Sequence, residues 1–123
     1  MKLLEQVTIG NKTLKNSMAM AAMTRSRAGL EGIVTDLTVA YYKQRATAGL
    51  IISEAINISR QALGSPFTPG LFTEAQIAAW RKVTQAVHEQ GSAIYAQLWH
   101  TGRVGHSVDR NGALPVAPSA VAI

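Results

Sequence analysis

The chain has 123 residues, 47% of them hydrophobic, and a formal net charge of +5 at pH 7. It contains no cysteine, which excludes disulfide and thiolate chemistry, and no apolar run of about 18 residues that would span a membrane. Lys and Arg are scattered and only 6% of residues are aromatic, so we expect no nucleic-acid binding. The positive charge fits a phosphorylated small ligand or a solvated surface. We also expect no metal site.

The N-terminal stretch MKLLEQVTIG is too short in apolar residues for a signal peptide, so we expect a soluble cytoplasmic protein. Residues 6–14 alternate apolar and polar side chains on both sides of Gly10-Asn11, which predicts a short β-hairpin. A run of small residues and methionines at 17–23 predicts the first strand of a repeated unit.

A first helix is predicted from 36 to about 48. Thr35 suits the N-cap position, and Gly49 suits the C-terminal stop. We expect Leu37, Tyr41 and Ala48 to face the core of the domain.

A second unit of the same kind follows. Its predicted parts are a strand at 50–56, a loop at 57–72, a helix at 74–90, a strand at 92–99 and a long loop at 100–123. Thr73 with Gln76 three residues later is the signature of a capping box, and Gly91 suits the end of that helix.

The order of elements predicts an α/β fold. Two successive βα units between 17 and 99 imply parallel strands, as in a doubly wound sheet or a (β/α)8 barrel. No glycine-rich fingerprint follows the first strand, which argues against a dinucleotide-binding Rossmann unit. A barrel needs about 200 to 250 residues. We therefore expect residues 1–123 to form the N-terminal portion of one barrel domain, with about three of its eight strands.

Polar side chains close each of the three strand-like runs. The sets are Thr24 and Arg25, then Ser53 and Glu54, and then Gln97, Trp99, His100 and Arg103. Because parallel strands of a barrel end at one rim, we expect a single ligand surface there. Glu54 is either a general base or the partner of Arg25 in a structural ion pair. His100 and Arg103 either pin the loop by hydrogen bonds or contact the ligand.

Five segments together resemble one family. They are AAMTRSRA (21–28), YYKQRATAGLIISEA (41–55), PGLFT (69–73), QLWHTGR (97–103) and PVAPSAV (115–121). In this order and spacing they resemble the N-terminal third of the Old Yellow Enzyme family, whose members are FMN-dependent ene-reductases built on a (β/α)8 TIM barrel. The flavin of that family lies at the C-terminal rim of the barrel strands.

The resemblance implies a set of cofactor-binding residues. Thr24 would donate a hydrogen bond to the flavin C4 carbonyl, and threonine here, where some relatives carry cysteine, makes the chain similar to the classical branch of the family. Main-chain groups of Ala22, Met23 and Ala55 would bracket the ring edge. Gln97 would meet the pyrimidine edge, because a carboxamide both donates and accepts.

The resemblance also implies a substrate wall made by Trp99. Many members place an aromatic residue, often tyrosine, where Ser65 falls, and Phe67 is the nearby residue that would replace it. Ala22 stands where proline is more common in the family, which should change the stiffness of the loop more than its chemistry.

The family's catalytic groups are absent from this chain. The pair that grips the substrate carbonyl and the tyrosine that protonates the α-carbon lie beyond Ile123. We therefore expect no catalytic residue here, and none of these roles passes to His88, His100 or His106.

Two functional hypotheses follow. The first is an N-terminal fragment or split chain of an FMN-dependent NAD(P)H oxidoreductase, completed by a companion polypeptide, that reduces activated C=C bonds of α,β-unsaturated carbonyl or nitro compounds. The second is a catalytically inactive, self-associating barrel fragment or interaction module. The sequence does not decide the alkene, the choice between NADPH and NADH, or the oligomeric state.

Overall fold

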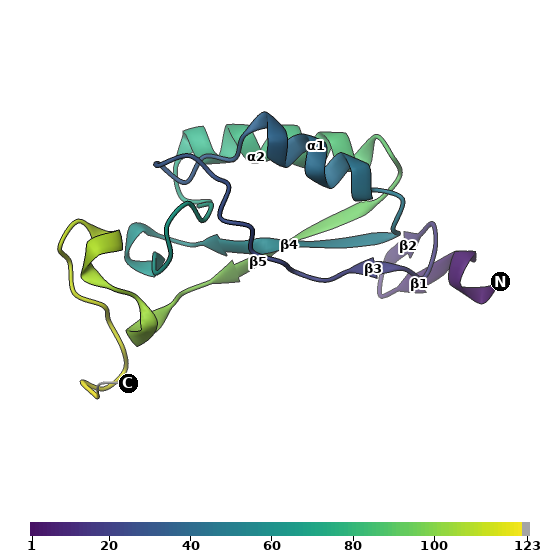
Figure 1. The fold of residues 1–123 in the computed structure, drawn as a ribbon. Helices are drawn as coiled ribbons and strands as arrows, with labels where there is room; N and C mark the ends of the chain where they lie inside the picture. Colours follow the sequence, from purple (N-terminus) through teal and green to yellow (C-terminus); the bar gives the residue numbers. More distant parts are fainter. Residues whose placement is uncertain (122–123) are drawn as a thin grey trace.

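Two helices cover one face of a three-stranded parallel sheet (Figure 1). The structure is a computed structural model that describes residues 1–121, so the last two residues of the loop expected at 100–123 lie outside the described residues. The sheet has the order β3-β4-β5, with β3 at Ala19–Met20, β4 at Leu50–Asn57 and β5 at Ala93–Trp99. The helices are α1 (Asp36–Arg45) and α2 (Glu74–His88).

A separate hairpin precedes the sheet. It follows a 3-10 turn at Lys2–Leu4 and consists of the antiparallel strands β1 (Val7–Ile9) and β2 (Lys12–Leu14). Gly10 has a φ of 59° in the turn, a conformation that costs a glycine little. The hairpin predicted around Gly10-Asn11 is therefore present.

The first strand of the sheet is shorter than the strand predicted at 17–23. Only Ala19 and Met20 pair with β4. The chain next contacts β4 at Arg25, whose main-chain N–H donates to the carboxylate of Glu54 over 3.4 Å. This bond to the Glu54 side chain takes the place of a main-chain bond between strands, and residues 21–24 are not paired in the sheet.

The core lies between the sheet and the helices. Its buried members are Val34, Tyr42, Ala46, Ile51, Ile56, Trp80, Val83 and Val87. Tyr42 is completely buried, whereas Leu37 is 75% exposed, so the prediction that Leu37 faces the core is wrong. The neighbouring Tyr41 is only partly buried and packs against the edge of this core.

Helix α1 ends at Arg45, before the predicted end near Ala48, because polar side chains capture its last carbonyl groups. The Ala46 carbonyl accepts from the Lys15 ammonium and, over 2.6 Å, from the Ser92 hydroxyl. Lys15 also donates to the Gln90 carbonyl beyond the end of α2. One cation therefore joins the C-terminal ends of both helices, where its charge is favourable.

The predicted capping box at the start of α2 is confirmed. Thr73 accepts from the Gln76 N–H at 3.3 Å, and the Gln76 carboxamide accepts from the Thr73 N–H at 3.1 Å. The same carboxamide donates to the Glu31 carbonyl at 2.9 Å. Gln76, which is buried, thus ties the loop before α1 to the start of α2.

The sheet face opposite the helices is open in the part of the chain that the structure describes. Tyr95, which shares a face of β5 with Gln97, is 50% exposed, and most of β5 is accessible; Leu98, on the other face of the strand, is 60% exposed. β5 is also an edge strand, since it pairs with β4 alone. A sheet with helices on one face and an open second face is the arrangement of a barrel segment.

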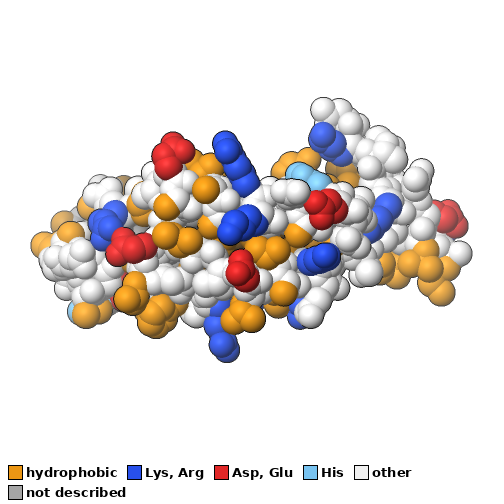
Figure 2. All heavy atoms as spheres, turned by 90° about the horizontal axis from the view of Figure 1, so that it is seen from above, with side chains coloured by type: hydrophobic (Ala, Val, Ile, Leu, Met, Phe, Trp, Pro, Cys, Tyr) orange, Lys and Arg blue, Asp and Glu red, His pale blue; other side chains and the backbone are white. Residues whose placement is uncertain are grey.

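The loop after β5 carries two 3-10 turns, Gly102–Val104 and Ser107–Arg110. The Arg110 side chain is buried against the Leu63 carbonyl and the Thr101 hydroxyl. Figure 2, which looks onto the helix layer, shows basic side chains scattered among acidic and apolar ones. No helix within residues 1–121 has the length and hydropathy that a membrane span requires.

Candidate functional site

The carboxyl ends of the parallel strands bring the predicted site residues to one rim. In the register of β4 and β5, Ala55 lies beside Gln97, and Asn57 lies beside Trp99. Residues two apart in a strand share a face, so these four residues follow one face of the sheet. Thr24 lies in the segment that follows β3.

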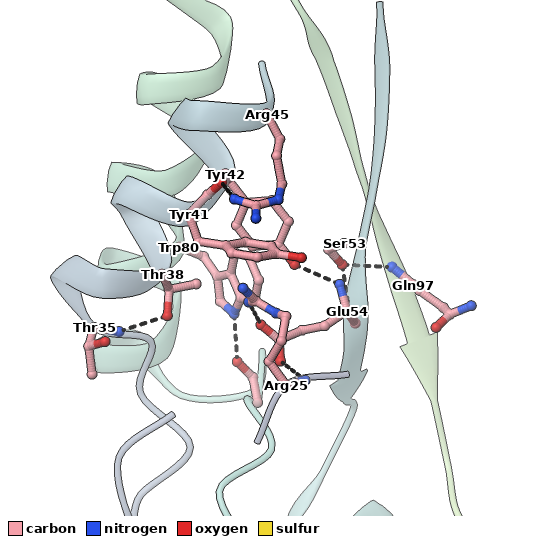
Figure 3. A network of polar contacts seen from close by, with 11 residues as sticks. Arg25, Thr35, Thr38, Tyr41, Tyr42, Arg45, Ser53, Glu54, Trp80 and Gln97 are labelled. Atoms are coloured by element: carbon pink, nitrogen blue, oxygen red, sulfur yellow. Dashed lines mark hydrogen bonds and ion pairs between the residues drawn. The ribbon is translucent and has the colours of Figure 1, made fainter. Parts of the chain in front are cut away.

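An irregularity in β4 changes which of its side chains point to each face of the sheet. The pairing shifts between Ile52 and Ala55. Ser53 lines an apolar hollow beside α2, and its hydroxyl accepts from the main-chain N–H of Gln97 at 3.1 Å. In Figure 3 the Gln97 carboxamide points away from Ser53 and from the helix layer. The bond therefore fixes the backbone of Gln97 and leaves its carboxamide available.

Several hydrogen-bonding groups at this rim are unused. Within residues 1–121, the hydroxyl of Thr24 and the carboxamide of Gln97 make no hydrogen bond, and both side chains are exposed. The main-chain N–H groups of Met23 and Thr24 likewise have no partner within the described residues. Ala22 is half-buried, and Ala55 is buried beside Gln97 in the sheet.

Glu54 forms a structural ion pair with Arg25, which confirms that alternative over a general base. The Glu54 side chain is only 3% exposed and accepts from both the guanidinium and the main-chain N–H of Arg25. The guanidinium of Arg25 also stacks on the ring of Tyr41, 3.5 Å from its centroid, and Arg45 stacks on the same ring at 3.7 Å (Figure 3). This stack holds the segment that follows Thr24 against α1.

Tyr42 supports the same part of β4 from the helix side. Its hydroxyl accepts from the main-chain N–H of Glu54 at 2.7 Å. Burial raises the pKa of Tyr42 from 10.0 to about 12, although the bond from Glu54 opposes this shift. Tyr42 therefore stays protonated and acts as a fixed polar support rather than as a proton carrier.

The two predicted substrate-wall residues belong to different segments. Trp99 is half-buried at the end of β5, and its indole N–H donates to the Asn57 carboxamide at 2.8 Å. Phe67 lies in the loop between β4 and α2, is 49% exposed and has a φ of 57°. Sequence reasoning missed Asn57, which it placed in the loop; a polar residue directly after a buried apolar run was the available signal.

His100 and Arg103 make local contacts that pin the loop. The His100 ring accepts from the Gly102 N–H at 2.9 Å, and Arg103 donates to the Val121 carbonyl at 2.9 Å. His106 similarly accepts from the Val108 N–H. These contacts favour the loop-pinning alternative for His100 and Arg103.

Comparison with known proteins gives consistent matches along the chain. The NADH:flavin oxidoreductase / NADH oxidase family matches residues 2–122. The flavin oxidoreductase hxnT of Emericella nidulans is 46% identical over 120 residues, which is 94% of this chain and 31% of that protein.

Solved structures agree with the sequence matches. The old yellow enzyme homologue from Zymomonas mobilis superposes with a TM-score of 0.92 and 48% identity, over 98% of this chain and 34% of that one. Morphinone reductase gives a TM-score of 0.93 and 48% identity, over 98% and 32%. The chain thus spans about a third of the length of these relatives. With its parallel βα units, this chain belongs to the NADH:flavin oxidoreductase / NADH oxidase family and matches the N-terminal third of an Old Yellow Enzyme barrel.

Proposed function

We propose that this chain forms one wall of the cofactor and substrate site in an FMN-dependent NAD(P)H oxidoreductase that reduces activated C=C bonds of α,β-unsaturated carbonyl or nitro compounds. The observation that carries the proposal is the set of exposed, unused hydrogen-bonding groups of Thr24 and Gln97 at the rim. When bound, FMN would take a hydride from the nicotinamide and deliver it to the alkene. A cytoplasmic location belongs to the same proposal.

The residues at the rim fit a flavin ring. The ring presents carbonyl oxygens and nitrogens along one edge, which require both donors and acceptors. The Thr24 hydroxyl and the Met23 N–H would donate to such oxygens, and the Gln97 carboxamide would donate and accept together. Ala22 and Ala55 have side chains small enough to let a planar ring approach their main chains.

The substrate side of the site would be lined by Trp99 and Phe67. Proton donation to the substrate lies outside this chain in the proposal. Glu54 is neutralised by Arg25, and Tyr42 is buried behind β4.

The open sheet face and the edge of β5 support the proposal that further strands complete the barrel. A companion polypeptide would bury Tyr95 and Leu98, which are half-exposed or more. The exposed apolar side chains on β5 equally favour the second candidate, association of this face with a further copy of the chain.

Native mass spectrometry of the purified protein, with a visible absorption spectrum of the same sample, tests the proposal. We expect flavin absorbance and a second polypeptide of roughly 200 residues or more, which would supply the missing strands. A colourless assembly made only of this chain would support the inactive, self-associating candidate and refute the enzymatic one.

A pair of variants then tests the site itself. We expect Thr24→Val to weaken FMN binding about five- to tenfold, which corresponds to one lost hydrogen bond. Thr47→Val is the matched control, because Thr47 is exposed at the opposite end of the sheet, just before β4. Equal FMN affinities for the two variants, measured by flavin fluorescence titration, would exclude a role for the Thr24 hydroxyl.

A further inference from the structure

Asn57 lies at the junction between β4, β5 and the loop that follows β4. It is completely buried, and it pairs with Trp99 at the last position of the β4–β5 register. Its main chain is fixed on both sides, because its N–H donates to the Pro69 carbonyl at 2.8 Å and its carbonyl accepts from the Leu71 N–H at 3.0 Å. The Asn57 backbone therefore leaves its side chain little freedom.

The carboxamide of Asn57 is used at both ends. Its oxygen accepts from the Trp99 indole N–H at 2.8 Å. Its nitrogen donates to the Thr68 hydroxyl and to the Pro69 carbonyl, both at 2.9 Å. Because these groups fix which end is oxygen and which is nitrogen, the carboxamide has a single orientation that satisfies all three bonds.

The same network reaches the residue next to Phe67. The Thr68 hydroxyl, which accepts from Asn57, donates onward to the Ser65 carbonyl at 2.9 Å. Ser65 and Thr68 flank the segment that carries Phe67. The two side chains proposed to line the substrate are therefore joined through one buried carboxamide, with Trp99 on one side and the Phe67 loop on the other.

We propose that Asn57 is a positioning residue that fixes the indole plane of Trp99 and couples it to the Phe67 loop, and thereby sets which substrates fit. This inference rests on the proposed function, since it concerns the substrate wall of that site. Without the acceptor at Asn57 the indole N–H has no partner in the described chain, and the ring is released to turn about its side-chain bonds. The rim then loses discrimination against bulky cyclic enones.

The two tryptophans make the indole contact directly measurable. In a ¹H–¹⁵N spectrum of the purified protein, persistence of the Trp80 indole signal shows that the core is folded, because this N–H donates to the Gly70 carbonyl at 3.1 Å. We expect Asn57→Leu to shift the Trp99 indole signal and to speed its hydrogen exchange about tenfold, while the Trp80 signal persists. Asn57→Asp keeps an acceptor oxygen, so its Trp99 indole signal should stay close to the wild-type position.

Thr68→Val tests the coupling without touching Trp99. It removes the hydroxyl that accepts from Asn57, so we expect a smaller movement of the Trp99 signal in the same direction. This variant also guards against a folding failure of Asn57→Leu, which loss of the Trp80 signal would reveal. An unchanged Trp99 signal in either variant that keeps the Trp80 signal would overturn the positioning role.

Specificity is tested in the flavin-loaded protein with 2-cyclohexenone and 3-phenyl-2-cyclohexenone. We expect Asn57→Leu to change the ratio of their KM values about five- to tenfold, with the effect on KM rather than on kcat. An unchanged ratio together with a released indole would overturn the specificity role. A wild-type protein that binds no flavin would instead overturn the proposed function, and with it the specificity role, whereas the indole result would still stand.

Discussion

Replacing Tyr42 by phenylalanine should change how the stability of the protein depends on pH. The Tyr42 hydroxyl accepts from the buried Glu54 N–H at 2.7 Å, and its burial raises its pKa from 10.0 to about 12. At pH 8 the variant loses only the hydrogen bond. Leaving that N–H unpaired should lower the free energy of unfolding by about 1–2 kcal/mol.

The difference in free energy of unfolding between wild type and variant should then disappear at high pH. Between the unfolded pKa of 10.0 and the folded pKa of about 12, the folded tyrosine binds more protons than the unfolded one. Stability from this group is therefore complete below pH 10 and is lost as the pH rises toward 12. At pH 11 this difference in pKa lowers the free energy of unfolding of the wild type by about 1.4 kcal/mol. The Tyr42→Phe variant has no hydroxyl at this position and does not lose this amount.

Urea unfolding followed by circular dichroism at pH 8, 9, 10 and 11 measures this difference. The other titrating groups are shared by both proteins, so they cancel when the two free energies of unfolding are subtracted. We expect the wild type to be more stable by about 1–2 kcal/mol at pH 8 and by roughly nothing at pH 11. A difference that stays constant across this range would refute the account of Tyr42 as a buried, protonated support.

Three further predictions, two of them with a control variant, are testable by urea unfolding at neutral pH. Glu54→Ala should cost about 3 kcal/mol because it leaves a largely buried guanidinium unpaired, and Glu54→Gln should cost less; equal losses would show that charge pairing is unimportant there. Gly49→Ala should cost more than about 2 kcal/mol, since the new Cβ meets the Asn16 carbonyl oxygen, whereas Gly91→Ala, in open space with a φ of 71°, should cost about 1 kcal/mol. Lys15→Met should cost about 1 kcal/mol, and a loss that grows as salt is added would contradict its role at the helix ends.

Local signals in the sequence were enough for the hairpin, the helix starts and the parallel order. Gly10-Asn11 supplies a turn that few other pairs allow, and Thr73 with Gln76 satisfies the first main-chain N–H groups of α2 without help from elsewhere. The hairpin turn and the helix cap depend on residues close together in the chain, and the parallel order follows from the alternation of strands and helices, so the sequence alone predicts all three.

The errors occurred where distant groups decide the outcome. Helix α1 ends early because Lys15 and Ser92, from before and after it in the chain, capture the Ala46 carbonyl. The sequence pattern predicts Leu37 and Tyr41 as inward residues, whereas packing against Trp80 places the neighbouring Tyr42 in the core.

At the rim, too, some features were predictable from nearby residues and others depended on distant groups. Thr24 and Gln97 were identifiable as polar groups after apolar runs, and the Arg25–Glu54 pair followed from their charges. Asn57 also follows a buried apolar run, but the groups that place it in the strand, Thr68 and Trp99, lie 11 and 42 positions away. A polar residue at the end of a strand reads as loop until its cross-strand neighbour is known.

The open edge of β5 has a consequence for how such a barrel is made in the cell. When a companion polypeptide supplies the strands that cover β5, they reach it only by association, so the edge stays open for an interval that depends on the concentration of the companion. During that interval the segment AIYAQLW presents unpaired main-chain groups and apolar side chains, and it contains neither a charge nor a proline to discourage intermolecular pairing. A barrel of this kind is therefore exposed to aggregation at this strand until the strand is covered, and a chaperone that shields it would raise the yield.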